Sequence, residues 1–366
     1  MCDEVVSPIV NMKHGNKIQD RPYSRRNYLR VSGAIAGGSV LGAAGCVGDD
    51  PDGDSDDEAV AGEGDPDQSH DWLIGTSYPV GHILNEGFID WADDIRDETD
   101  GRIDITIEEQ LDGEFEMLEQ VSIGAIEGVS MGSGWIVEYG EGALWVKGMF
   151  FFEDWETNLA AYDDPIFDET VENFRDRGNT HLLGGPIYRG AREMTANQAV
   201  SEPEDFEGLD MRLPEVDDWV RLWSSLGVNP TTVAFDELYS ALQTGVVSAQ
   251  ENPVQDISAM GLPEVQDYLI RTSHVFSAAW LGINEERWED LHPDDQALLN
   301  ESVETKSREL DEQIMEQEEG LVDELEDEGM EVIEPNLDAI QAVVLEEVEA
   351  MFDDGTWRGD KDEILG

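Results

Sequence analysis

Three side chains in the middle of the sequence have the chemistry to bind a small organic anion. Arg192 lies in the segment GAREMT, Arg212 in MRLP and Asn252 in QENP. The planar guanidinium of an arginine matches the two oxygens of a carboxylate, and an asparagine amide adds another donor. However, an arginine in a chain with 85 acidic residues also has many surface partners. The residue types alone leave both carboxylate binding and a surface ion pair open.

The elements around these side chains favour a ligand site. Residues 210–213 are predicted to form a short strand that carries Arg212, and the helix after it is predicted to open at Pro214. Asn252 follows a second predicted strand, which begins at Val246 and Val247. Open α/β sheets bind ligands at the carboxyl ends of their strands. The sequence therefore predicts that Arg212 and Asn252 lie at one such edge.

The hydrophobic pattern predicts an α/β fold. Residues 73–75 are a short strand candidate. Phe88, Trp91, Ala92 and Ile95 are spaced as one helix face, and residues 103–107 alternate as a half-buried strand. A helix beginning near residue 117 and a strand over 125–131 follow. A β-α-β-α-β order implies a mostly parallel sheet with helices on its faces.

A second unit is predicted to begin around Gly184. Its helices are expected over residues 216–226 and after an N-cap at Asp236, the latter ending at Gly245. Later, apolar residues recur every four or seven positions from Leu299 to Leu325, which predicts one long helix with an acidic back.

Residues 190–253 resemble the DctP-like solute-binding subunit of tripartite ATP-independent periplasmic (TRAP) transporters, of a haloarchaeal type. The segments that carry the resemblance are PEDFEGLDMRLP, ELYSALQTG and QENP, and weaker similarity extends over roughly residues 72–330. The resemblance implies a two-lobed periplasmic-binding-protein-like fold, with crossing strands and a long helix that spans both lobes. It also implies capture of a small organic carboxylate in the cleft and its delivery to the small and large membrane subunits.

Site residues follow from the resemblance position by position. Arg212 is expected to pair with the ligand carboxylate, Asn252 to hydrogen-bond it, and Arg192 to be a second cationic contact. Phe235 is expected to line the pocket. Where sialic-acid binders place an acidic residue, this chain has Gly132 and Ser133, which favours a smaller mono- or dicarboxylate. Further aromatic side chains are candidates for the pocket wall: Tyr78, Trp135, Tyr188 and Trp280.

The resemblance also sets the expected organisation. Domain I is predicted over residues 71–189 with 278–317, and domain II over 190–277 with 318–366. We expect a monomer that has no cofactor and no catalytic activity. A binding protein of an ATP-driven importer is the alternative, since it shares the two-lobed plan without requiring Arg212 and Asn252.

The first 70 residues predict export and anchoring. The segment SRRNYLR resembles a twin-arginine signal, and the apolar run after it is too short for a confident membrane span. Residues 1–45 are therefore predicted to be a lipoprotein signal that ends at Cys46, the expected site of lipid attachment. Residues 46–70 are predicted to be an acidic tether. The mature protein is then extracytoplasmic and held to the outer face of the cell membrane by its lipid alone.

The net charge of −64 indicates a habitat more than a function. Only five lysines are present, and the acidic residues are spread through segments with regular apolar periodicity. Such a surface suits molar salt, where the Debye length is about 3 Å and self-repulsion is screened. The same charge argues against nucleic acid and anionic membranes as partners.

Chemistry of other kinds has little support. The sequence contains no metal-spaced Cys or His cluster and no phosphate-binding glycine loop. Residues 128–132 match G-x-S-x-G, with Ser130 as the possible nucleophile. That motif needs a helix directly after the serine, and the glycines that follow disfavour one. A serine hydrolase is therefore the weakest of the three function classes.

Overall fold

The first five elements alternate between strand and helix. The structure is a computed structural model that describes residues 64–366 except 141, 362, 363, 365 and 366. The signal segment and Cys46 lie outside the described residues. The predicted order of strands and helices is confirmed. The apolar face that predicted the first helix, Phe88, Trp91, Ala92 and Ile95, is buried in α2. The elements are β1 (His70–Thr76), α2 (Ile83–Glu98), β2 (Ile103–Glu109), α3 (Glu114–Ser122) and β3 (Gly128–Met131).

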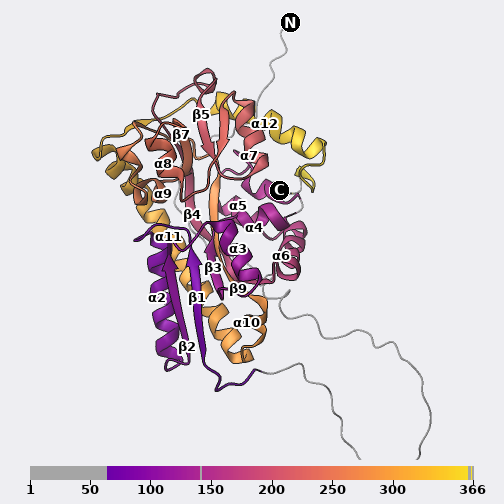
Figure 1. Ribbon diagram of the computed structural model, residues 1–366. Helices are drawn as coiled ribbons and strands as arrows, with labels where there is room; N and C mark the ends of the chain where they lie inside the picture. Colours follow the sequence, from indigo (N-terminus) through magenta and orange to yellow (C-terminus); the bar gives the residue numbers. More distant parts are fainter. Residues whose placement is uncertain (1–63, 141, 362–363, 365–366) are drawn as a thin grey trace, which may run out of the picture.

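The strand β4 (Thr180–Ala196) connects two parts of the sheet. The strand order is β2-β1-β3-β9-β4-β7-β5-β6, with β4 antiparallel to β9 (Phe276–Asn284) and to β7 (Ala249–Pro253). Figure 1 shows β1, β2 and β3 in the lower part of the molecule and β5 and β7 in the upper part. Gly184, where a second unit was expected to begin, lies inside this continuous 17-residue strand.

The upper part contains the strands predicted to carry the site. β5 (Asp210–Leu213) coincides with the predicted strand and is parallel to both β6 (Asn229–Thr232) and β7. The carboxyl ends of β5 and β7 therefore point to the same edge of the sheet. The helices and minor strands of this part are α7 (Asp217–Ser225), α8 (Leu238–Gln243), α9 (Val254–Ala259), β8 (Tyr268–Ile270), β10 (Glu331–Ile333), η2 (Pro203–Phe206) and η3 (Leu262–Glu264).

Three predicted boundaries are wrong. The helix predicted to open at Pro214 begins at Asp217, because Pro214 forms a turn in which its carbonyl accepts from the Val216 amide. The helix cap is Glu237 rather than Asp236. The strand predicted at Val246 begins at Ala249, where pairing with β4 starts, and Val246 is exposed.

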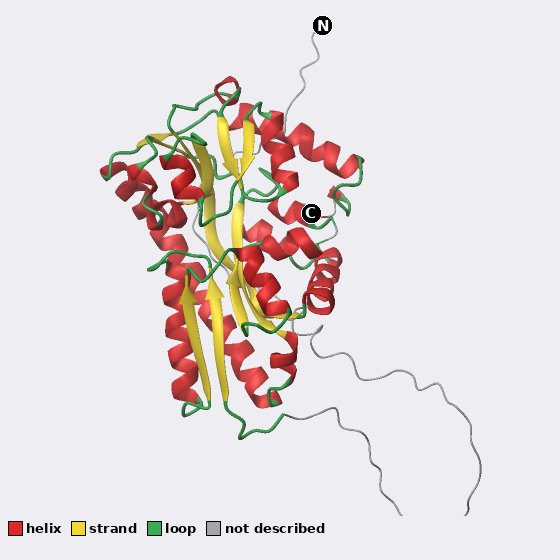
Figure 2. Ribbon diagram, in the orientation of Figure 1, coloured by secondary structure: helices red, strands yellow, loops and turns green. Residues whose placement is uncertain are grey.

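One long helix, which the apolar spacing predicts, lies along both parts of the sheet, as the resemblance implies. This helix, α11 (Pro293–Asp327), has 35 residues and packs on β4, α2 and α9. The C-terminal helix α12 (Leu337–Asp353) packs on α7. Figure 2 shows helices on both sides of the strands. The remaining helices are α4 (Gly134–Tyr139), η1 (Leu144–Lys147), α5 (Trp155–Ala161), α6 (Pro165–Gly178) and α10 (Glu285–Glu289).

No helix within the described ranges is long and apolar enough to cross a membrane.

Candidate ligand-binding site

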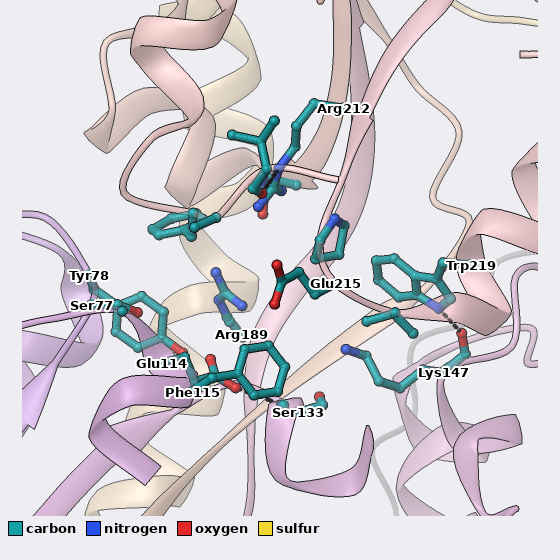
Figure 3. A pocket seen from close by; sticks show the side chains of 18 of the residues that line it. Ser77, Tyr78, Glu114, Phe115, Ser133, Lys147, Arg189, Arg212, Glu215 and Trp219 are labelled. Atoms are coloured by element: carbon teal, nitrogen blue, oxygen red, sulfur yellow. Dashed lines mark hydrogen bonds between the residues drawn. The ribbon is translucent and has the colours of Figure 1, made fainter. Parts of the chain in front are cut away.

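A cavity of about 140 Å³ opens where the two parts of the sheet meet. The lower part contributes the loop after β1 and the first turns of α3 and α4, and the upper part contributes the ends of β5 and β7. Figure 3 shows charged and aromatic side chains pointing into this space from several elements. Five of the eight predicted site residues line it: Tyr78, Arg192, Arg212, Phe235 and Asn252.

Arg212 is a buried cation that has no counter-ion among the described residues. It lies in β5, its side chain is 2% exposed, and its Nε donates to the Val233 carbonyl at 2.8 Å. No carboxylate of the described residues forms an ion pair with it. Burial lowers the pKa of Arg212 to about 10, and Glu251 opposes that shift. The guanidinium therefore stays charged at neutral pH, with its terminal nitrogens available at the cavity.

Arg192, in contrast, is held by buried protein groups. Its Nε and Nη2 donate to the Glu251 carboxylate, and Nη2 also donates to Asn252 Oδ1 at 2.8 Å. Its guanidinium lies 5.0 Å from the centre of the Trp219 ring. The Asn252 amide in turn donates to Gln250 Oε1 at 2.7 Å, which fixes its orientation. Arg192 and Asn252 thus form one bonded wall of the cavity.

His274 completes the support of the Glu251 carboxylate. Its Nε2 lies 3.0 Å from Glu251 Oε2, and its Nδ1 lies 2.8 Å from the Thr272 hydroxyl. Burial alone would raise the pKa of Glu251, but Arg192 and His274 outweigh burial and bring it to about 2. The Glu251 carboxylate is therefore ionised and forms an ion pair with Arg192.

Arg189 is a cavity residue that the sequence analysis missed. It lies three positions before Arg192, and an odd spacing places two side chains on opposite faces of a regular strand. The pairing of β4 with β9 shifts between Tyr188 and Gly190, and Gly190 has a φ of +118° that favours glycine. This irregularity brings both arginines to the cavity.

A second buried ion pair holds Arg189. Its Nη2 donates to Asp256 Oδ2 at 2.8 Å, and His82 Nε2 lies 3.2 Å from the other oxygen of Asp256. The Arg189 guanidinium also lies over the rings of Tyr78, at 4.7 Å, and Phe235, at 5.7 Å. Although burial opposes it, Asp256 raises the pKa of Arg189. The charge of Arg189 is therefore balanced by Asp256, as the charge of Arg192 is balanced by Glu251.

Lys147 and two glutamates also line the cavity and were missed. Lys147 is buried in η1, and Glu114 accepts from the amides of Gly132 and Gly134 at 2.9 and 2.6 Å. Glu215 is exposed. The run ALWVKGMFFF over residues 143–152 holds a signal for Lys147, because a single lysine interrupts nine apolar residues or glycine.

Three predicted wall residues lie elsewhere. Trp135 and Trp280 pack edge to face at 5.4 Å, and Tyr188 packs against the Trp155 ring at 5.0 Å while its hydroxyl donates to Glu318. All three are buried in the hydrophobic core and none lines the cavity. Tyr188 and Trp280 lie on β4 and β9, whose residues are almost all buried, so a large ring there is used for packing. Trp135 lies in α4, where its ring stacks on Phe174 of α6 at 5.0 Å.

Ser130 lies inside β3, with its side chain fully buried and its strand paired to β9. A nucleophile must be reachable by its substrate, and this hydroxyl is not. Among the described residues, no group of three or more His, Cys, Asp or Glu side chains could hold a metal ion.

Residues 74–354 match the family described as "Bacterial extracellular solute-binding protein, family 7". The chain belongs to this family. Two relatives are similar over most of this solute-binding protein. One, a solute-binding protein of Roseobacter denitrificans, is 28% identical over 285 residues, which cover 74% of this chain and 85% of the relative. The other, the sialic acid-binding periplasmic protein SiaP of Vibrio cholerae, is 27% identical over 273 residues, which cover 72% and 83%.

Solved structures agree with this family assignment. A TRAP periplasmic solute-binding protein of Roseobacter denitrificans with bound L-galactonate has a TM-score of 0.72 and 25% identity, covering 77% of this chain and 94% of that one. A second protein of the same organism, with bound 3-deoxy-D-manno-oct-2-ulosonic acid, has a TM-score of 0.74 and 25% identity, covering 82% and 100%. The two-lobed α/β fold that the resemblance implied is confirmed for this solute-binding protein.

Proposed function

We propose that this chain is the extracytoplasmic binding component of a TRAP-type secondary transporter and holds a small organic carboxylate in the cavity between its lobes. The observation that carries the proposal is the buried guanidinium of Arg212, which has no ion pair within the described part of the chain. A charge removed from water is unfavourable unless it gains a partner. A ligand carboxylate supplies that partner with two parallel hydrogen bonds.

The other cavity residues have supporting roles in this proposal. Asn252 donates its free N–H to the same carboxylate, and Arg192, whose charge is paired with Glu251, positions Asn252. Phe235 and Tyr78 cover the apolar part of the ligand, since both rings already line the cavity and flank Arg189. The relatives with bound L-galactonate and 3-deoxy-D-manno-oct-2-ulosonic acid support an acidic ligand.

Delivery requires that the ligand favour a closed form. In our proposal, domain I (71–189 with 278–317) and domain II (190–277 with 318–366) close over the cavity because the ligand contacts both. Arg212 comes from the upper part, and Ser77 and Glu114 come from the lower part. The closed monomer then docks on the small and large membrane subunits.

Titration calorimetry with small mono- and dicarboxylates tests the binding role of Arg212. Removing one partner of a buried charge pair costs about 2–5 kcal/mol, which is roughly 30- to 5,000-fold in affinity. Arg212→Ala should therefore nearly abolish binding, and Arg212→Lys should also bind poorly because an ammonium lacks the planar fork.

Arg221→Ala is the matched control. Arg221 is bonded to Glu347 and Asp354 and does not line the cavity, so its removal should change the binding free energy by less than about 0.5 kcal/mol. Near-native affinity in Arg212→Ala, for whichever acid the native protein binds, would contradict the carboxylate function.

Anchoring through Cys46 is a further part of the proposal. The twin-arginine pattern at Arg25 and Arg26 and the small residues before Cys46 support it. Replacing both arginines with lysine should block export, and Cys46→Ser should release exported protein from the membrane fraction. An undiminished membrane fraction in Cys46→Ser would rule out the lipid anchor.

Life at high salt is also proposed, on the net charge of −64. The protein should lose secondary structure when salt falls from molar to roughly 0.1 M, where the Debye length is about 10 Å and self-repulsion is no longer screened. Circular dichroism and melting temperatures that do not change between the two conditions would contradict this adaptation.

A further inference from the structure

Lys147 is a second buried cation for which the structure supplies no counter-ion. Its side chain lines the cavity and the residue is only 8% exposed. The ammonium lies 4.6 Å from the centre of the Trp219 ring. Within the described part of the chain, it has no hydrogen-bond acceptor and no carboxylate partner. A lysine ammonium is strongly hydrated, so this burial is unfavourable unless something else contacts it.

The acidic groups near Lys147 are occupied by other donors. Glu114 is held by two backbone amides, and Glu251 is held by Arg192 and His274. Burial, together with the positive charges of Arg192 and Arg189, lowers the pKa of Lys147 to about 7. The negative charges of Glu114 and Glu251 oppose this shift. Burial is the largest cause of the lowered pKa of Lys147, and neither Glu114 nor Glu251 forms an ion pair with its ammonium among the described residues.

The backbone beneath Lys147 is fixed. Trp219 Nε1 donates to the Lys147 carbonyl at 2.9 Å, and Asn158 Nδ2 donates to the Val146 carbonyl at 2.7 Å. Lys147 thus joins the indole of α7 to η1 in the other part of the molecule. The side chain that this backbone carries lines the cavity and lies against the Trp219 ring.

We propose that Lys147 binds a second anionic group of the ligand, so that the cavity selects dicarboxylates over monocarboxylates with the same carbon skeleton. Figure 3 shows Lys147 and Arg212 entering the cavity from different elements. One carboxylate neutralises Arg212 and leaves Lys147 unpaired, whereas a dicarboxylate neutralises both. The inference rests on the proposed function, in which Arg212 binds the first carboxylate.

Matched ligand pairs test this selection. In each pair, a terminal CH₂OH of the monocarboxylate is replaced by a carboxylate: D-erythronate with meso-tartrate, and galactonate with galactarate. Calorimetric titrations at high salt compare native protein with Lys147→Met, which keeps the length of the side chain without its charge. Lys147→Arg keeps the charge, and circular dichroism checks that both variants are folded.

We expect native protein to bind the dicarboxylate of at least one pair more tightly than its monocarboxylate. Lys147→Met should weaken dicarboxylate binding by about 30-fold or more and leave monocarboxylate binding nearly unchanged. Lys147→Arg should retain part of the preference. Near pH 7, dicarboxylate binding should take up protons, because a neighbouring carboxylate favours the charged ammonium. Titrations in buffers of different ionisation enthalpy should show this uptake in native protein and not in Lys147→Met.

Equal affinity for both members of each pair, or an equal loss for both in Lys147→Met, would overturn the role of Lys147 and leave the carboxylate function intact. If native protein bound neither member of either pair nor any other carboxylate, the proposed function itself would fail, and the selection by Lys147 with it. If Lys147→Met does not fold, the test rests on Lys147→Arg and on proton uptake by native protein. The absence of proton uptake on dicarboxylate binding would also overturn the proposal.

Discussion

Arg192 and Arg212 are 20 residues apart in sequence and line the same cavity, yet they differ in how their charge is neutralised. Arg192 is bonded to the carboxylate of Glu251, to Asn252 and to Ser277. Arg212 has one hydrogen bond, to a backbone carbonyl, and no ion pair among the described residues. Both side chains are almost fully buried. The difference separates a cation that is bonded into the cavity wall from one that the described residues leave without an ion pair.

The same division holds for the other two cations of the cavity. Arg189 is paired with Asp256 and belongs with Arg192. Lys147 has no ion pair with any residue that the structure describes and belongs with Arg212. Breaking a buried pair leaves an uncompensated charge, which is strongly destabilising. Removing an unpaired buried charge relieves a desolvation penalty instead. Stability measurements therefore distinguish the two kinds of cation without any ligand.

The largest effect is expected from Arg192→Met. This change leaves Glu251 buried without its main partner, and the expected loss of stability is about 3–5 kcal/mol. Urea denaturation at a constant molar salt concentration measures it. A loss below about 1 kcal/mol would show that the pair with Glu251 does not hold the cavity wall.

A smaller effect, which depends on pH, is expected from Glu251→Gln. The pKa of Glu251 is about 2 in the folded protein and 4.5 ordinarily, so its contribution to stability is fully present above about pH 4.5. It is lost as the pH falls toward 2, because the folded protein must then take up a proton. The stability difference between native protein and Glu251→Gln should therefore shrink over this range. A difference that does not change with pH would contradict an ionised, paired Glu251.

Arg221→Ala should destabilise the protein by about 0.2–1 kcal/mol. Arg221 pairs with Glu347 at the surface, and its side chain is 34% exposed. Solvent and salt screen such a pair, so raising the salt concentration should reduce the effect further. A loss as large as that of Arg192→Met would mean that burial does not explain the contrast between these arginines.

The smallest effect is expected from Arg212→Met. The change removes an unpaired buried charge and one hydrogen bond to Val233, and these terms oppose each other. The stability of the ligand-free protein should stay within about 1 kcal/mol of native, and a slight increase would fit as well. A loss comparable to that of Arg192→Met would place Arg212 among the structural cations. The same substitution at both positions makes the two results directly comparable.

The sequence by itself determined the first five elements, β5, α11 and the sheet edge that carries Arg212 and Asn252. The apolar spacing predicted α2, β2 and α11, and β5 has the predicted bounds. These patterns are local, because a helix or strand buries the face that its own residues provide. The sequence also predicted that Arg212 and Asn252 lie at one edge of the sheet, and they do, because β5 and β7 are parallel neighbours.

Only the tertiary structure decided which charges are paired. Glu251 reaches Arg192 from 59 residues away, through the antiparallel register of β4 and β7, and no spacing in the sequence encodes that register. Gly190 brings Arg189 to the cavity by breaking the alternation of β4. Lys147 is buried because η1 packs against Trp219 from another part of the chain. The charge that a ligand meets in this cavity is what remains after these long-range pairs form, so it follows from the folded arrangement and not from the list of cationic residues.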